Sequence, residues 1–372
     1  MRIGVLGSGQ LGRMMALAGY PLGLRLRFFD RNPNTPAGQV ADCVTAAFDD
    51  LAALERFSAG LDIVTYEFEN VPVTAAQYLA GRVRHFFPPP RALEIAQDRY
   101  VQKRFFEEIG VPTSVFRPVN TRAELASAIE ATGLPAVLKT RHWGYDGKGQ
   151  FVLRESSDLD RAWETLGESP LILESFVRFR RELSLIAARS VTGDAVFYPL
   201  TENHHREGIL RLSLAPASDA SATLQERARA FAEKIFGALD YAGVLTLEMF
   251  EADGHLLANE MATRVHNSGH WTIEGAETSQ FENHLRAIAG LPLGSAETRG
   301  CAAMVNFIGS LPEATEVLAI PGVHLHVYGK QPNHRRKLGH ATLCAAKWQT
   351  LEASLNRLLC LAGISAPQHT SL

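Results

Sequence analysis

The first ninety residues alternate between short apolar runs and amphipathic stretches. The apolar runs predict strands at Arg2–Gly7, Leu24–Asp30, Leu61–Tyr66 and His85–Phe87, and a period near 3.6 predicts a helix at Gln10–Gly19. Strands that alternate with helices form parallel sheets with right-handed crossovers. The run Pro88-Pro89-Pro90 can neither join a sheet nor continue a helix. We therefore predict an N-terminal α/β domain over residues 1–90.

The rest of the chain is predicted to be α+β. Helical periodicity covers Arg91–Ile109, which Gly110-Val111-Pro112 ends, and Leu224–Leu239. Strands are predicted at Pro135–Thr140, Gln150–Arg154, Leu171–Glu174, Glu182–Ala188, Gly243–Glu251, His255–Met261 and Val323–Tyr328. Glycines between 294 and 300 suggest a second boundary. We expect a central domain over 91–295 and a small C-terminal domain over 296–372.

Composition narrows the class of protein. The 372 residues suit two or three domains, and 46% apolar with 21% charged residues is ordinary for a globular chain. A net charge of −3 argues against nucleic acid or an anionic membrane as partner. The chain has no long apolar span or signal peptide, and its four cysteines show no metal or disulfide spacing. We expect a cytoplasmic protein that binds small molecules.

A glycine-rich turn follows the first predicted strand. Residues Gly7–Gly12 fit the pattern G-x-G-x-x-G, and Asp30 ends the next predicted strand. Such a turn can bring a phosphate to a helix N-terminus, with the acidic residue on a ribose. The same glycines also suit a tight turn that binds no nucleotide, and both readings stay open.

A second glycine-rich stretch follows Lys139. Gly144, Gly147 and Gly149 surround Lys148, close to the end of the strand that carries Lys139. Backbone N–H groups and two ammonium groups suit a triphosphate under a closing loop. The alternative is a hairpin with a glycine turn and solvated lysines.

Two glutamates lie on the two strands around Asp253-Gly254. If the loop holds three residues, Glu248 stands opposite Glu260, and the pair could hold Mg²⁺ together with phosphate oxygens. If the turn holds two residues, Glu248 faces Asn259 instead and the paired site is lost.

Hydrogen-bonding side chains are dense in the run from Arg264 to Trp271. They suit an anionic, polyhydroxylated substrate, although a capped loop with satisfied histidines is the alternative. Glu67 follows a predicted strand, where ligand contacts gather in α/β sheets. The charge runs Arg180-Arg181 and Arg335-Arg336-Lys337 either bind phosphate or form solvated faces.

Taken together, these stretches resemble the ATP-grasp superfamily and, within it, the 5-(carboxyamino)imidazole ribonucleotide synthases of purine biosynthesis. The matching segments are GSGQLGRM (7–14), YEFENVP (66–72), GYDGKGQ (144–150), FYPLTENHH (197–205), NEMATRVHNSGHWT (259–272), VHLHVYGK (323–330) and RRKLGH (335–340). The resemblance implies a Rossmann-like N-terminal domain, an ATP-grasp body and a small β-rich C-terminal domain. It also implies a homodimer.

The implied activity is that of an ATP-dependent carbon–nitrogen ligase. Bicarbonate would be joined to 5-aminoimidazole ribonucleotide through carboxyphosphate, giving ADP and phosphate, with ATP and Mg²⁺ as cofactors. In such a reaction the protein neutralises charge, orients the reactants and excludes water.

The resemblance also assigns roles to individual residues. The residues that match nucleotide contacts are Arg99, Lys139, Gly144, Tyr145, Asp146, Gly147, Lys148, Gly149, Gln150, Glu174, Ser175, Phe176, Val177, Glu182, His205, Asn259 and Glu260. Those that match the Mg²⁺ ligands are Glu248 and Glu260. The ribonucleotide would contact Gln10, Leu11, Glu67, Asn267, Ser268, Lys330, Arg336 and Lys337. The expected catalytic residues are Arg264, His266, Asn267 and Lys139.

Two positions depart from the family's usual pattern. Trp143 stands where a glycine is usual before Gly144, and Thr263 replaces a proline before Arg264. Losing that proline frees the backbone beside Arg264 and leaves the direction of its side chain open. Other ATP-grasp ligases that use formate or biotin, a dinucleotide-dependent oxidoreductase and a nucleotide-sensing module remain alternatives.

Overall fold

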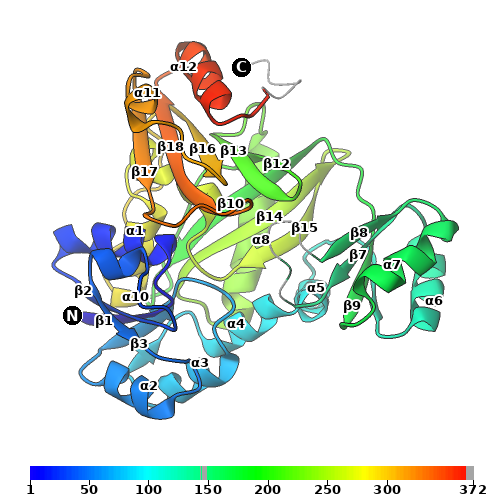
Figure 1. Ribbon diagram of the computed structural model, residues 1–372, viewed down its shortest axis with the longest axis horizontal. Helices are drawn as coiled ribbons and strands as arrows, with labels where there is room; N and C mark the ends of the chain where they lie inside the picture. Colours follow the sequence, from blue (N-terminus) through cyan, green and yellow to red (C-terminus); the bar gives the residue numbers. More distant parts are fainter. Residues whose placement is uncertain (143, 145–148, 366–372) are drawn as a thin grey trace.

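The computed structural model describes residues 1–142, 144 and 149–365, and the strands of this part form three sheets (Figure 1). The N-terminal sheet has the order β3-β2-β1-β4-β5, and every neighbouring pair is parallel, as predicted. Its strands are β1 (Arg2–Leu6), β2 (Arg25–Asp30), β3 (Asp42–Thr45), β4 (Ile63–Tyr66) and β5 (His85–Phe86). Its helices are α1 (Gln10–Gly19), α2 (Leu51–Ser58) and α3 (Val73–Ala80), with 3-10 turns at Tyr20–Leu22 and Ala37–Gln39.

The single helix predicted over Arg91–Ile109 is two helices, α4 (Pro90–Gln97) and α5 (Arg99–Glu108). Asp98 separates them because its backbone is extended and its carboxylate accepts hydrogen bonds from the N–H groups of Tyr100 and Val101. The same carboxylate also binds the Arg141 guanidinium at 2.5 Å. The periodicity of the sequence continues through Asp98, so the break was not visible in the pattern.

The second sheet is small and antiparallel, with the order β6-β9-β7-β8. Its strands are β6 (Phe116–Val119), β7 (Ala136–Thr140), β8 (Gln150–Leu153) and β9 (Leu171–Ser175), and they pack with α6 (Arg122–Thr132) and α7 (Leu159–Leu166). A core of its own, with Val119, Leu138 and Leu173, holds this small lobe together. The lobe projects from the rest of the molecule on the right of Figure 1.

The third and largest sheet has the order β15-β14-β10-β12-β13-β16-β18-β17, with β11 paired to β10. Its strands are β10 (Arg181–Arg189), β11 (Ala195–Phe197), β12 (Thr201–Arg206), β13 (Ile209–Ala215), β14 (Gly243–Ala252), β15 (His255–Ala262), β16 (Cys301–Ile308), β17 (Val323–Val327) and β18 (Lys337–Ala345). Because β13 pairs with β16, the sheet runs without interruption past the expected boundary near residue 295. The last strands therefore share one sheet with the central part of the chain.

Helices pack against the strands of this large sheet. They are α8 (Ala222–Leu239), α9 (Thr272–Gly275), α10 (Gln280–Ala289), α11 (Ala314–Leu318) and α12 (Trp348–Leu361), with 3-10 turns at Ser156–Asp158 in the small lobe and Asn267–Gly269 before α9. Of these helices, α8 and α10 contact β10, and α9 and α12 contact β16 and β18. One buried cluster joins Val5 of β1 and Leu285 of α10 to Trp271 and Tyr328. This shared core holds the N-terminal sheet against the large sheet.

Buried polar contacts reinforce the junction between sheets. His284 Nδ1 accepts from the Val244 N–H at 3.1 Å, so its Nε2–H donates to the Thr65 hydroxyl at 3.0 Å. Arg181 is buried between the carboxylates of Glu202 and Glu251, at 3.0 and 2.5 Å. Arg181 is thus a structural ion-pair residue, neither a phosphate ligand nor part of a solvated face. No helix within the described residues is long and apolar enough to cross a membrane.

Candidate functional site

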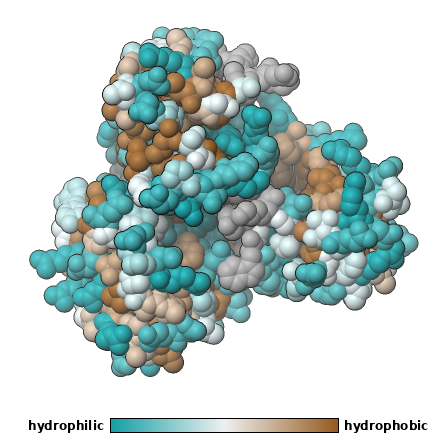
Figure 2. All heavy atoms as spheres, viewed as in Figure 1, coloured by the Kyte–Doolittle hydropathy of each residue, from teal (hydrophilic) through white to brown (hydrophobic). Residues whose placement is uncertain are grey.

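Two cavities, each of about 370 Å³, meet in the middle of the molecule. The first cavity lies among the N-terminal loops, the start of α5 and the segment after β15. The second cavity lies between the small sheet and the β10–β14–β15 part of the large sheet. The residues that line both are Arg99, His205, Gly208, Glu248 and Glu260. The surface of the molecule is hollowed between its lobes, with hydrophilic residues around the hollow (Figure 2).

A buried lysine–glutamate–lysine group forms one wall of the second cavity. The carboxylate oxygens of Glu174 lie 3.0 Å from Lys139 Nζ and 3.2 Å from Lys103 Nζ. Burial alone would raise the pKa of Glu174, but the two ammonium groups outweigh it and lower the pKa from 4.5 to about 2. Lys139 lines the cavity, whereas Lys103 is buried and donates to Thr113, Ser114 and the Ala258 carbonyl. Lys103 thereby ties α5 and β15 to the small lobe.

The two ion pairs of Glu174 should make the stability of the fold depend on pH in the acid range. The folded-state pKa of Glu174 is depressed, so its contribution to stability is complete above about pH 4.5 and is lost as the pH falls toward 2. We expect Glu174→Gln to lower the free energy of unfolding by about 3–5 kcal/mol near neutral pH, since two buried cations lose their counter-charge. Urea unfolding at several pH values measures this. The difference between wild type and variant should shrink below about pH 4, and a constant difference would contradict the assignment.

Apolar side chains line the rest of the second cavity. Val137 and Val152 lie on the small sheet, and the rings of Phe179 and Phe250 stack with their centroids 4.7 Å apart. An apolar slot with cations at one end suits a flat base that carries phosphates. The sequence analysis did not identify Phe179 and Phe250, because two isolated aromatic residues gave no spacing signal.

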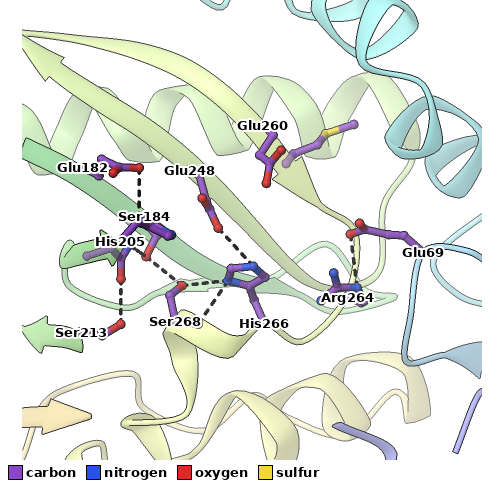
Figure 3. Close-up of polar contacts among 12 residues, drawn as sticks. Glu69, Glu182, Ser184, His205, Ser213, Glu248, Glu260, Arg264, His266 and Ser268 are labelled. Carbon is purple, nitrogen blue, oxygen red and sulfur yellow. Dashed lines mark hydrogen bonds and ion pairs between the residues drawn. The ribbon is translucent and has the colours of Figure 1, made fainter. Parts of the chain in front are cut away.

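Glu248 and Glu260, which line both cavities, lie on neighbouring strands (Figure 3). Glu248 on β14 stands opposite Glu260 on β15. The turn holds only Asp253 and Gly254, both with positive φ, and a two-residue turn was expected to separate the pair. A β-bulge restores the pairing of the two glutamates. Met249 pairs with Ala258, Asn259 is the extra residue, and Glu248 therefore pairs with Glu260. The turn length and the pairing were therefore not linked in the way the sequence analysis assumed.

The electrostatics of this junction favour a bound cation. Burial and the nearby charge of Glu260 raise the pKa of Glu248 from 4.5 to about 8. His266 Nε2 lies 3.1 Å from Glu248 Oε1, and burial followed by the charges of Arg264 and Lys337 lowers the pKa of His266 well below its usual value. Burial acts to lower the pKa of His205, but the contact with Glu182 and the charges of Glu182, Glu248 and Glu260 together outweigh it and raise that pKa. The two close carboxylates disfavour each other's charged forms, and a bound cation would allow both to be ionised.

Arg264 is held in the first cavity by neighbours on both sides. Its Nε lies 3.3 Å from Glu69 Oε1, and its Nη1 donates to the Val265 carbonyl at 3.0 Å. The preceding Thr263 is fully buried, and its hydroxyl accepts from the Tyr66 O–H at 2.9 Å. Tyr66 thus fixes the chain at the position where the family's proline is missing. Glu69 was missed by the sequence analysis, although it lies two residues after Glu67 in the same motif.

The glycine-rich turn before α1 is occupied by a side chain of the protein itself. Glu67 accepts from the N–H groups of Gly9 and Gly12, at 2.8 and 3.1 Å. A Cβ at Gly9 would lie 2.8 Å from a Glu67 oxygen, so any other residue there would displace this carboxylate. Burial raises the pKa of Glu67, and these backbone donors oppose the rise. The amides that would bind a dinucleotide pyrophosphate are therefore already used, and the dinucleotide interpretation is not supported.

Most of the predicted site residues line the two cavities. The second cavity is lined by Arg99, Lys139, Gln150, Glu174, Ser175, Phe176, Val177, Glu182, His205, Glu248, Asn259 and Glu260. The first cavity is lined by Gln10, Leu11, Glu67, Gly144, Arg264, His266, Asn267 and Lys337. Tyr145, Asp146, Gly147, Lys148 and Trp143 lie outside the described residues.

Of the predicted residues that the structure describes, four line neither cavity. Gly149 adopts a positive φ beside Thr140, and Ser268 is fully buried against His266. The Lys330 ammonium donates to the Gln10 side chain, which itself lines the first cavity. Arg336 is exposed and donates to the Gln331 carbonyl at 3.0 Å, so its contact with a ribonucleotide stays a prediction.

Known proteins are similar to this chain over nearly its whole length. Family models match residues 1–97 as a ribonucleotide synthetase preATP-grasp domain, 104–281 as an ATP-grasp domain and 302–354 as a phosphoribosylaminoimidazole carboxylase C-terminal domain. The N5-carboxyaminoimidazole ribonucleotide synthase of Pseudomonas aeruginosa is 50% identical, over 95% of this chain and 98% of its own. The chain belongs to the N5-carboxyaminoimidazole ribonucleotide synthase family.

Solved structures of this synthase family agree closely with the fold. The Thermus thermophilus enzyme has a TM-score of 0.93 and 55% identity, covering 98% of this chain and 99% of that one. The Aspergillus clavatus enzyme, solved with ADP and 5-aminoimidazole ribonucleotide, has a TM-score of 0.91 and 33% identity, covering 97% and 98%. The chain is thus an ATP-dependent ligase of the ATP-grasp type, and the expected fold is confirmed.

Proposed function

We propose that this enzyme carboxylates 5-aminoimidazole ribonucleotide with bicarbonate, at the expense of ATP, in de novo purine biosynthesis. The observation that carries the proposal is the meeting of two cavities at Glu248 and Glu260. A nucleotide in the second cavity would present its terminal phosphate where the first cavity begins. Bicarbonate and the ribonucleotide would then occupy the first cavity, beside Arg264 and His266.

The residues at the junction fit a divalent cation. Among the described residues no cluster of three or more His, Cys, Asp or Glu side chains forms a metal site, but Mg²⁺ is commonly held by one or two carboxylates together with phosphate oxygens. Glu248 and Glu260 provide such a pair, and burial together with the charge of Glu260 raises the pKa of Glu248. When bound, Mg²⁺ would neutralise charge on the phosphates.

The protein's own residues account for the remaining tasks. Lys139 places an ammonium group in the second cavity, and Arg99 bridges the Gly144 carbonyl and Glu260, at 2.8 and 3.8 Å. A bicarbonate oxygen attacks the terminal phosphorus and ADP leaves, which gives carboxyphosphate. The ribonucleotide amine then forms the new N–C bond, the C–O bond to phosphate breaks, and the released phosphate accepts the amine proton. Arg264 lines the first cavity and offers positive charge to these anions.

Release of ADP tests this proposal directly. With ATP, Mg²⁺ and bicarbonate present, we expect 5-aminoimidazole ribonucleotide to stimulate ADP release strongly. Detection of the N-carboxylated product would identify the reaction. Equal release without the ribonucleotide, or stimulation by formate or biotin instead, would contradict the substrate assignment.

We also propose that the enzyme is a cytoplasmic homodimer, as the sequence resemblance implies. Light scattering coupled to size-exclusion chromatography tests the oligomeric state. An elution mass near that of a single 40.7 kDa chain would contradict it.

A further inference from the structure

A line of buried polar side chains extends from Glu248 into the large sheet (Figure 3). After His266 its members are Ser268 in the 3-10 turn Asn267–Gly269, Ser184 on β10, Asn203 on β12 and Ser213 on β13. All four are buried, and the three serines have no exposed surface. Successive contacts measure 2.9 Å from His266 Nδ1 to Ser268 Oγ, 2.9 Å to Ser184, 2.9 Å to Asn203 and 2.8 Å to Ser213.

One backbone group fixes the direction of every hydrogen bond in this line. The Ser268 N–H donates to His266 Nδ1 at 3.2 Å, and a backbone N–H can only donate. Nδ1 is therefore an acceptor without a proton, and the Ser268 hydroxyl must donate to it as well. Because the Ser268 hydroxyl donates its hydrogen bond to His266, its oxygen accepts one from the Ser184 hydroxyl.

The same reasoning continues to the end of the line. The Ser184 hydroxyl donates to Ser268, so its oxygen accepts a hydrogen bond from the Asn203 side-chain amide Nδ2–H. The Asn203 oxygen is then turned toward Ser213, whose hydroxyl donates to it. Each contact pairs one donor with one acceptor, so all hydrogen bonds in the line point in the same direction, from Ser213 toward His266.

We propose that Ser213, Asn203, Ser184 and Ser268 form a positioning network that holds His266 as the neutral tautomer with its proton on Nε2. That nitrogen lies 3.1 Å from Glu248 Oε1, at the junction of the two cavities. His266 then offers a proton, and its Nε2 cannot accept one from the ribonucleotide amine. The effect of the network on the rate rests on the proposed function, whereas the tautomer does not.

Two variants test the network in different ways. Asn203→Asp keeps the shape of the side chain but replaces its donor by an acceptor, so the Ser184 hydroxyl would turn toward it. Ser184 would then accept from Ser268, which would no longer donate to His266. Ser268→Ala removes the same donor without burying a charge. In both we expect kcat to fall about five- to tenfold, as for one lost hydrogen bond, while KM for ATP is unchanged because no member lines the second cavity.

The tautomer is read by nitrogen-15 NMR of protein labelled at histidine, with His266→Gln used to assign the resonances. In the wild type we expect an unprotonated Nδ1 and a protonated Nε2. The Nδ1 resonance should shift in both variants. A proton on Nδ1 in the wild type, or an unchanged resonance in folded Asn203→Asp and Ser268→Ala proteins, would overturn the inference.

Thr246→Val is the matched control. Thr246 on β14 carries a fully buried hydroxyl that has no hydrogen-bond partner among the described residues, and it lies outside the network. This variant should leave the Nδ1 resonance and kcat unchanged, and an equal loss of kcat in it would overturn the network role. The NMR experiment needs no substrate, so a wrong tautomer is distinguishable from a missing response to the ribonucleotide.

Discussion

Replacing Glu260 by glutamine (Glu260→Gln) is expected to lower ATP turnover by about a thousandfold. The substitution keeps the shape of the side chain but removes one of the two charges that face each other across β14 and β15. A divalent cation stabilises transferring phosphoryl groups by several kcal/mol, and each 1.4 kcal/mol corresponds to about a tenfold change in rate. ADP release at saturating ATP and increasing Mg²⁺ measures the effect.

The fold of this variant should remain intact. Without added metal ions, Glu260→Gln should unfold at the wild-type temperature or above it, because the repulsion between Glu260 and the buried Glu248 is relieved. Glu233→Gln on α8, where the carboxylate is exposed, serves as the control and should keep full activity. Near wild-type turnover in a folded Glu260→Gln protein would contradict the assignment of the metal site.

Lys139→Ala is expected to reduce ADP release by about a hundred- to a thousandfold. The Lys139 ammonium lies on the wall of the second cavity, 3.0 Å from Glu174, where it can offset charge on a nucleotide phosphate. Loss of one preorganised charge or donor in a closed site typically has an effect of this size. Steady-state kinetics with varied ATP measures both kcat and KM.

The neighbouring lysine makes this result interpretable. Glu174 keeps its contact with Lys103 at 3.2 Å when Lys139 is removed, so the carboxylate does not become an unpaired buried charge. The variant should therefore remain folded, as circular dichroism and thermal unfolding would show. Lys347→Ala, at an exposed position before α12, is the matched control. Unchanged kinetics in Lys139→Ala would contradict its place in the nucleotide site.

The N-terminal domain shows which features of the fold the hydrophobic pattern of the sequence predicts. Alternating strands and helices predicted a parallel sheet, and the structure confirms it. The pattern did not show that Glu67, from the end of another strand, occupies the amides of Gly9 and Gly12. That contact joins residues more than fifty positions apart, so it depends on packing that local periodicity does not record.

The glutamate hairpin shows the same limit in the register of strands. Spacing in the sequence offered two alternatives, each derived from a turn length and an unbroken ladder. The actual turn has two residues, and a bulge at Asn259 nevertheless places Glu248 opposite Glu260. Bulges arise from the fit of a strand to its neighbours, here β14 to both β10 and β15, and a turn motif does not specify them.

The sequence by itself determined the chemistry available to this protein: the lysines, glutamates, glycine loops and the Arg264–Trp271 run, and through their order the family resemblance. It also determined most strands and helices, because hydrophobic period and capping act over a few residues. Only the tertiary structure decided which of these groups meet. The bulge at Asn259 and the line of hydrogen bonds from Ser213 to His266 depend on contacts between distant parts of the chain, which are set by the packing of the whole chain.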